Sequence, residues 1–254
     1  MSRDFRDEVL RHVLNQVQID AQELDLLPYA DWHERVERSV RSFVPDLIGF
    51  APDLMEEVQL ILNSPRVIRE SWDRLNSKLK ERGLAEEMKR DLALIESELA
   101  RESHLLAQIT GETVSGLISD FWCRVRPDIV KNNRSTYPDL YFDWAQYSML
   151  PRRSKSNTKG PALKGANPTS VPDGVEVKSQ RGESIRVDCH HPHQGMHLVM
   201  TVDYINETWE VYDVYIAYLS RTEYKRAARN TTATTEKFSF SHAPFVSVLD
   251  KSAL

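Results

Sequence analysis

Cysteine is scarce in this chain of 254 residues, which contains two, Cys123 and Cys189. Because they stand in unrelated contexts and form no Cys-x-x-Cys pair, the sequence predicts neither a disulfide framework nor a cysteine zinc site. The chain has nine glycines and twelve prolines without a period, which excludes a collagen-like chain and a dominant low-complexity composition.

Long hydrophobic runs are lacking as well. The longest uncharged apolar stretch, residues 196–202, is far shorter than the ~20 residues that span a bilayer. The amino terminus carries mixed charges, whereas a signal peptide has a basic start followed by an apolar run. We therefore expect no transmembrane helix and a cytoplasmic protein.

Charge is distributed unevenly around a formal net value of −5. Residues 1–130 hold 17 basic and 25 acidic side chains, residues 131–186 hold 10 and 5, and residues 187–254 hold 6 and 8. One internal stretch is thus basic in an otherwise acidic protein. This pattern is typical of a localised surface for a polyanion, although a solvated loop that collects cations would leave the same pattern.

Helical periodicity dominates the first half of the chain. Apolar residues from Leu84 to Ile109 recur every three or four positions, which predicts a helix of about 25 residues that ends at Gly111. A shorter helix is predicted over Val114–Arg124, with Pro127 ending it. Stripes of this kind usually form a core, so we assign this half a structural role. The same spacing links Val9, Val13 and Val17, and then Val36, Val40 and Phe43.

The second half changes to the alternation that is typical of strands. It is present around Val175 and Val177, around Ile185 and Val187, and over Trp209–Tyr218. Residues 196–205 read as a buried strand, and residues 206–208 as a turn that leads into an antiparallel partner. Residues 151–168 are rich in cations and turn formers and cannot form a core element.

The chemically informative segment is Pro-Asp-Gly-Val-Glu-Val-Lys-Ser-Gln-Arg-Gly at residues 172–182. In a strand, Glu176 and Lys178 project from one face, while the valines beside them face the core. Upstream, Asp139 follows Pro138 at the start of an aromatic-rich strand. Two carboxylates that meet across neighbouring strands form an oxygen site suited to Mg²⁺.

Such a site can hydrolyse a phosphodiester. A bound metal lowers the pKa of a water and neutralises charge on the phosphorus centre, and a lysine can orient or deprotonate the attacking water. The basic stretch would supply a surface for the phosphate backbone. A Glu-x-Lys strand also occurs as an ion pair on a solvated face, which is the alternative interpretation.

At these residues the chain resembles the PD-(D/E)xK nucleases, and the settings Tyr-Pro-Asp-Leu and Gly-Val-Glu-Val-Lys-Ser resemble type II restriction endonucleases in particular. The resemblance covers residues 136–182. It implies that Asp139 and Glu176 bind Mg²⁺, that Lys178 is the catalytic lysine, and that the protein is a homodimer acting on double-stranded DNA. The 36 residues between Asp139 and Glu176 exceed the common spacing, and an inserted loop at 151–170 would account for them.

With the resemblance, the expected fold is α/β (α+β), a helical amino-terminal half plus a mixed sheet flanked by helices, with a restriction-endonuclease-like core. Residues 1–130 would form a mainly helical region that serves dimerisation or embraces DNA. Residues 131–254 would form the catalytic β-rich core.

Other carboxylates compete for the metal site. Asp173 is closer to Glu176 in sequence, but residues three apart in an extended chain point to opposite faces, so we interpret Asp173 as part of a turn. Asp143 is a reserve ligand, because it is four residues after Asp139. Glu112 or Glu102 would add an acid from the helix boundary upstream, although a solvated helix residue is the simpler interpretation.

Cations near the catalytic strand and in the basic loop are the candidates for DNA contacts, to phosphates or to the guanine edge. A polar loop predicted at residues 229–235 is a further candidate for base contacts, although an ordinary surface loop is the simpler interpretation. The cluster Cys-His-His-Pro-His at 189–193, with His197 beyond, lacks a second ligand pair at zinc-finger spacing, so we do not assign zinc to it. We expect these histidines to line a strand end near the DNA cleft or to make surface polar contacts. The predicted DNA-binding residues are Arg152, Arg153, Lys155, Lys159, Lys164, Arg181 and Arg186.

Three functions follow from these features. The first is a Mg²⁺-dependent, sequence-specific endonuclease of restriction type. The second keeps the same fold but cleaves during repair or at particular DNA structures. The third is a non-catalytic DNA-binding or interaction protein in which Glu-Val-Lys is incidental.

Overall fold

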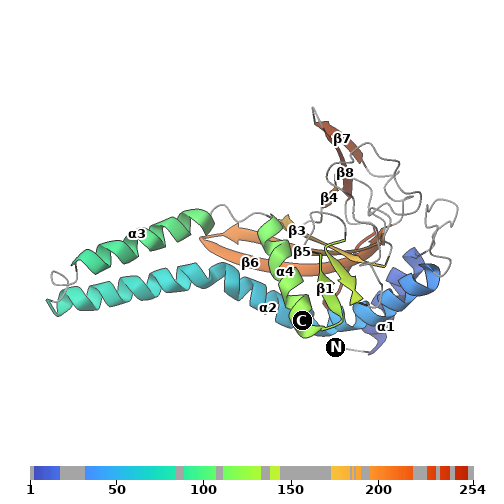
Figure 1. Cartoon of the computed structure of the whole chain (residues 1–254), viewed down its shortest axis with the longest axis horizontal. Helices are drawn as coiled ribbons and strands as arrows, with labels where there is room; N and C mark the ends of the chain where they lie inside the picture. The colour runs from blue at the N-terminus through green and yellow to red at the C-terminus, as the bar shows by residue number, and fades with distance from the viewer. Residues whose placement is uncertain are drawn as a thin grey trace.

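Helices precede two β-sheets in the computed structural model of the chain (Figure 1). The structure describes residues 3–17, 32–83, 89–106, 111–132, 138–143, 173–183, 185, 187–189, 195–219, 228–232, 235–240 and 244–250. Every structural statement below refers to these residues.

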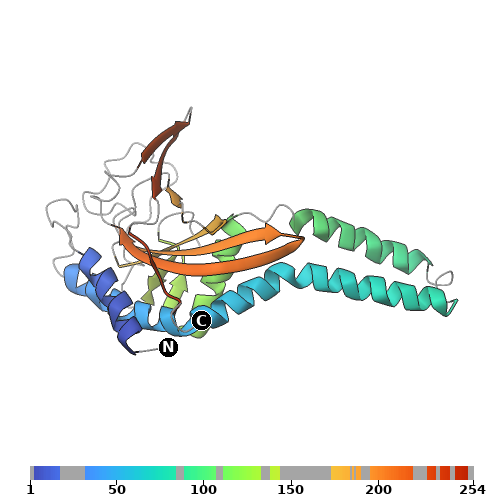
Figure 2. The same ribbon diagram turned by 180° about the vertical axis from the view of Figure 1, so that it is seen from behind.

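Four helices occupy the described part of the first half: α1 (Arg3–Gln16), α2 (Trp32–Glu81), α3 (Lys89–Leu106) and α4 (Gly111–Val125). The predicted helical character of this half is therefore confirmed. Helix α2 is 50 residues long. Its first part runs beneath the sheet, and its second part projects away from the sheet with α3 beside it (Figures 1 and 2).

Gly111 begins a helix, which corrects the prediction that it ends one. The glycine lies against the carboxyl-terminal half of the third strand, where its carbonyl accepts a hydrogen bond from Ser179 Oγ at 3.0 Å. A Cβ at Gly111 would lie 3.1 Å from the same oxygen. Gly111 thus lies at a close approach between α4 and β3, and not at the end of a helix.

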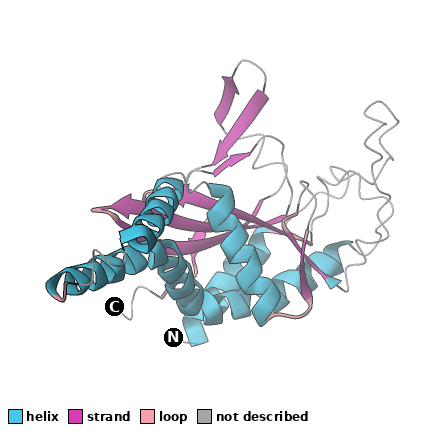
Figure 3. Cartoon of the chain, turned by 60° about the vertical axis from the view of Figure 1, so that its left-hand side comes forward, coloured by secondary structure: helices cyan, strands magenta, loops and turns pink. Residues whose placement is uncertain are grey.

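The larger sheet has six strands in the order β1-β2-β3-β5-β6-β9. Figure 3 draws the strands in magenta and the helices in cyan. Strands β3 and β5 run parallel, and the other neighbours run antiparallel. Strands β4, β8 and β7 form a second, three-stranded sheet. The strands are β1 (Ile129–Lys131), β2 (Leu140–Phe142), β3 (Val175–Arg181), β4 (Val187–Cys189), β5 (Gly195–Ile205), β6 (Thr208–Leu219), β7 (Ala228–Thr232), β8 (Thr235–Phe240) and β9 (Val246–Ser247).

The predicted hairpin of the second half is confirmed. Strands β5 and β6 pair antiparallel along most of their length. Asn206 and Glu207 connect them with φ angles of 50° and 63°, the left-handed values that a two-residue hairpin turn requires. The fold is accordingly mixed α/β, as the sequence predicted at that level.

One hydrophobic core joins the helices to one face of the large sheet. It contains residues of α1, α2 and α4 together with Val175 and Val177 of β3. A smaller apolar cluster, with Val199 and Leu219 among its members, lies on the opposite face. In Figures 1 and 2, helices α1 and α2 lie on one side of the large sheet and strands β7 and β8 on the other. None of the described helices is both long and apolar enough to cross a membrane.

The junction of β2 and β3 is packed without spare space. Gly174 is buried directly before β3, and a Cβ there would lie 2.2 Å from Cγ of Pro138 and 3.2 Å from the Leu140 carbonyl oxygen. Only a residue without a side chain fits this contact. Because Pro138 precedes Asp139, the contact also fixes the position of Asp139 directly before β2.

Gly174→Ala should therefore destabilise the protein by about 1–3 kcal/mol, because the added methyl group forces the two strands apart. The measurement is the free energy of unfolding in urea. Gly116→Ala is the matched control, because Gly116 lies within α4 with no neighbouring atom within 4 Å of the added Cβ. This control should raise stability by up to ~1 kcal/mol. Equal effects of the two substitutions would contradict the close-contact argument.

Candidate active site

Asp139 lies beside β3, although 36 residues separate it from Glu176 in the sequence. Leu140 of β2 pairs with Val175 of β3, which places the start of β2 next to Glu176. The backbone N–H of Val177 donates a hydrogen bond to Asp139 Oδ2 at 2.8 Å. The structure thus brings together the two carboxylates that the sequence predicted to meet.

Glu176 and Lys178 share a face of β3, as the alternation predicted. Lys178 Nζ donates to Glu176 Oε1 at 2.5 Å. The valines on either side of Glu176 belong to the core on the opposite face. Glu176 is only 5% exposed, whereas the Lys178 side chain is about one-third exposed at 32%. The pair therefore joins a buried carboxylate to an ammonium that reaches solvent.

Burial raises the pKa of the Glu176 carboxyl from its ordinary 4.5 to about 7. The Lys178 ammonium opposes this rise, and the negative charge of Asp139 adds to it. Among the described residues, Glu176 Oε2 is buried without a hydrogen-bond partner. A buried acceptor without a donor is costly, so this oxygen is available for a cation.

Asn132 fixes the backbone that carries Asp139. Its side-chain Nδ2 donates to the Pro138 carbonyl at 2.8 Å, and its backbone N–H donates to the Asp139 carbonyl at 2.8 Å. Asn132 follows β1 directly, so the two bonds close the connection between β1 and β2 at the site. Sequence reasoning missed this residue, because an asparagine after a short strand is also typical of an ordinary turn.

His197 is a second polar residue near the site, and the sequence predicted that it lines a strand end near the DNA cleft or makes surface polar contacts. It pairs with Glu176 in the parallel register of β3 and β5, so both side chains lie on the same face. His197 is fully buried, and its Nδ1 lies 3.0 Å from the Gly195 carbonyl oxygen. That contact favours the tautomer with the proton on Nδ1. His197 is thus a buried polar side chain, not a surface one, and it lies beside Glu176 on the same face of the sheet.

The donor set fits a hard divalent cation such as Mg²⁺. Two carboxylates from neighbouring strands face one place, and one of their oxygens, Glu176 Oε2, is buried without a partner. Mg²⁺ commonly takes one or two protein carboxylates and keeps water or phosphate oxygens as its other ligands. A group of three or more His, Cys, Asp or Glu side chains suited to a metal is absent from the described residues, so protein ligands alone would not complete the shell.

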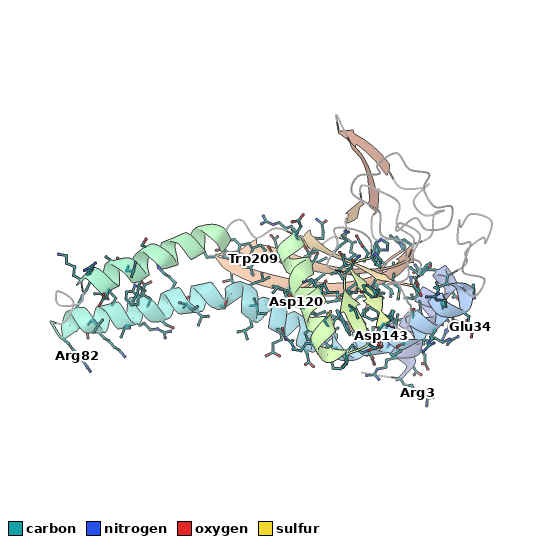
Figure 4. All side chains as sticks on the ribbon, in the orientation of Figure 1. Arg3, Glu34, Arg82, Asp120, Asp143 and Trp209 are labelled. Atoms are coloured by element: carbon teal, nitrogen blue, oxygen red, sulfur yellow. The ribbon has the colours of Figure 1, made fainter. Side chains whose placement is uncertain are left out.

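Other predicted acids lie away from this place. Asp143 is exposed beyond the far end of β2 (Figure 4), and the antiparallel pairing puts it beside the residues before β3. Asp173 forms the expected turn, where Arg35 of α2 lies 3.3 Å from it as an ion-pair partner. Glu112 is exposed in the first turn of α4. Because α4 covers the valine face of β3, Glu112 is on the opposite side of the sheet from Glu176.

Arg181, a predicted DNA contact, is exposed at the end of β3. Its guanidinium lies over the Trp209 ring, 5.5 Å from the centroid. It is three positions after Lys178 in the strand, so it faces the opposite side of the sheet. The prediction of a loop at 229–235 is wrong for residues 229–232, which belong to strand β7, and for Thr235, which begins β8. The side chains of this segment and the other predicted DNA contacts lie outside the described part of the chain. These contacts are Arg152, Arg153, Lys155, Lys159, Lys164 and Arg186.

The raised pKa of Glu176 predicts that stability depends on pH. A carboxyl that titrates near 7 when folded and near 4.5 when unfolded holds its proton longer in the native state, so stability is full below pH 4.5 and falls as pH rises toward 7. The loss amounts to up to about 3 kcal/mol. Glu176→Gln removes the titration.

The measurement is urea unfolding of both proteins from pH 5 to 8 in the presence of a chelator. The wild type should lose stability relative to Glu176→Gln as pH rises, and the difference should level off above pH 7. A difference that is constant with pH would show that the carboxyl titrates normally. Added Mg²⁺ should reduce the difference if the cation binds the ionised carboxylate.

Comparison with known proteins adds no relative to this description: no family model, no curated protein and no solved structure matches the chain.

Proposed function

We propose that this protein is a Mg²⁺-dependent endonuclease that hydrolyses phosphodiester bonds in double-stranded DNA at specific sequences, in the manner of type II restriction endonucleases. The observation that carries the proposal is the convergence of Asp139 with the Glu176–Lys178 pair on adjacent strands. This is the arrangement that the resemblance to PD-(D/E)xK nucleases implies. The mixed sheet, with helices packed on one face among the described residues, is compatible with a restriction-endonuclease-like core.

Asp139 and Glu176 would hold the Mg²⁺ ion in this proposal. The bond from Val177 N–H fixes one Asp139 oxygen, so the carboxylate is oriented before any ion arrives. Burial keeps Glu176 short of polar partners, which favours a cation at its remaining oxygen. When bound, Mg²⁺ supplies positive charge that stabilises the negative charge developing on the phosphate oxygens.

Lys178 would act on the attacking water. An ammonium has three donors, so Lys178 can hold Glu176 and orient a water at the same time. The water oxygen forms a new bond to phosphorus, its proton passes to a base or to solvent, and the bond from phosphorus to the leaving sugar oxygen breaks. The partial exposure of Lys178 leaves room for a substrate phosphate beside it.

The DNA surface would come from the basic stretch of residues 131–186, which connects Asp139 with the catalytic strand. Its ten basic side chains against five acidic ones favour contact with the phosphate backbone. Cleavage of both strands at a two-fold symmetric sequence calls for two catalytic centres, and we therefore include a homodimer in the proposal.

The first test is digestion of plasmid and phage DNA with Mg²⁺. The wild type should give discrete fragments, and Lys178→Ala and Glu176→Ala should lower the cleavage rate by at least about 10³-fold because each removes a group that acts on the reacting atoms. Asp143→Asn is the matched control and should retain activity, since Asp143 is exposed away from the site.

Sequencing of the fragment ends separates the candidate functions. A constant sequence at the ends supports the restriction type, whereas ends that follow nicks or mismatches support a repair or structure-specific nuclease. If no phosphodiester is cut but DNA is bound equally well with Ca²⁺ and Mg²⁺, the protein is a binding protein and the proposal is wrong.

Asn132→Ala tests the positioning of Asp139. Loss of the bond to the Pro138 carbonyl should loosen the Asp139 carboxylate and lower the cleavage rate by roughly tenfold at limiting Mg²⁺. Because the side chain of Asn132 does not act on the substrate in this scheme, higher Mg²⁺ concentrations should restore part of the rate. A rate loss that is the same at all Mg²⁺ concentrations would argue against this role.

A further inference from the structure

The helical arm, which we define as residues 60–106, exposes apolar side chains that the fold does not cover. It consists of the second part of α2 and of α3, and it projects from the sheet with Arg82 at its tip and Trp209 where it meets the sheet (Figure 4). The two helices pack on one another through Trp72, Leu79 and Leu92. Large hydrophobic side chains remain exposed outside this contact: Leu60, Ile61, Val67, Ile68, Leu75, Leu94 and Ile95.

Six of these side chains form one stripe, which we call the apolar seam: Leu60, Ile61, Val67, Ile68, Leu75 and Ile95. On α2 they recur at seven-residue intervals, as in Ile61, Ile68 and Leu75, and positions seven apart lie within about 20° of each other around a helix. This is the spacing of a helix that packs lengthwise against another helix.

Helix α3 extends the seam on the same side. At ~100° per residue, Ile68 and Leu75 are turned slightly to one side of Trp72, the α2 residue that faces α3. Ile95 is turned in the same sense from Leu92, the α3 residue that faces α2. In two antiparallel helices that face each other, side chains rotated by the same angle from the contact lie on the same side of the helix pair. Ile68, Leu75 and Ile95 therefore lie along one edge of the contact between α2 and α3. Leu94, by contrast, points away from α2.

The two serines within the seam do not oppose its burial, whereas the exposed side chains of Lys78 and Asp91 lie at its border at ~100° per residue. Ser64 and Ser71 lie between the apolar positions, and their hydroxyls donate to the backbone carbonyls of Ile61 and Val67 at 2.8 Å each. Each hydroxyl proton is thus used within the helix, so the serines act as small spacers. Charged pairs lie elsewhere on α2: Arg66 pairs with Glu70, and Arg69 with Asp73, on the opposite side of the helix.

We propose that the apolar seam is the surface on which a second copy of this chain packs, so that two helical arms form a four-helix bundle. The charge of the arm favours this occupant over DNA, because residues 60–106 carry nine basic and nine acidic side chains. A net charge of zero gives no general attraction for a polyanion. It also removes general repulsion between two identical arms.

The size of the arm is suited to a stable dimer. Residues 60–81 of α2 form 22 residues of helix, which corresponds to ~33 Å of length, and two helices side by side are ~20 Å wide. The resulting face of roughly 650 Å² per arm is most of the ~800 Å² that each partner contributes to a standard interface.

The test measures the mass of the purified full-length protein by light scattering or sedimentation at micromolar concentration, without DNA or Mg²⁺. The wild type should have twice the mass of a 29.3 kDa chain. Ile68→Glu should raise the dimer dissociation constant by roughly 100-fold or more, because each dimer would bury two unpaired carboxylates. Ile68 is 51% exposed, so the substitution should leave the monomer folded, which circular dichroism checks.

Leu94→Glu is the matched control. It places the same charge on the same arm at a side chain that is 64% exposed and faces away from the seam, and it should leave the dimer intact. A monomeric wild type, a dimer that survives Ile68→Glu, or equal dissociation by both substitutions would overturn the proposal. Because this experiment measures mass and not DNA cleavage, its result is independent of the cleavage tests. The dimer proposal can be wrong while the nuclease proposal is right, and the reverse.

Discussion

The hydrogen bond from the Val177 backbone to Asp139 Oδ2 is the constraint on which the candidate site depends. It joins a residue directly before β2 to β3, so that two residues 38 positions apart in the sequence are in contact. Two neighbouring features hold the same junction: the close contact of Pro138 with Gly174, and the two bonds from Asn132. Without this junction, Glu176 and Lys178 would be an isolated ion pair on a strand.

The ion pair itself is not an ordinary surface pair. Exposed Lys–Glu pairs contribute little to stability, but here the carboxylate is buried and its second oxygen has no partner among the described residues. The fold therefore tolerates an unfavourable arrangement at a buried position between two core valines of β3. Such local costs are common where a protein keeps a group for binding or catalysis.

Much of this arrangement could be predicted from the sequence, because strand alternation is a local property. The alternation of Val175, Glu176, Val177 and Lys178 set the two faces of β3 correctly, and the turn at Asn206 was visible from its residue types. Asn132, Gly174 and the start of α4 at Gly111 were not predicted. Their roles depend on contacts with residues that are far away in the sequence. The local sequence around each residue does not indicate such contacts. The projecting arm was missed for a similar reason. Helical periodicity indicates which residues of a helix form an apolar face, but it does not show whether another part of the fold packs on that face.

The long connection between Asp139 and Glu176 has a consequence of its own. Both of its ends are fixed at one strand junction, so the separation of the two carboxylates does not depend on how many residues lie between them. The entropy cost of closing a flexible loop grows only slowly with its length. Insertions, deletions and substitutions between these two ends can therefore accumulate while the acidic pair stays in place.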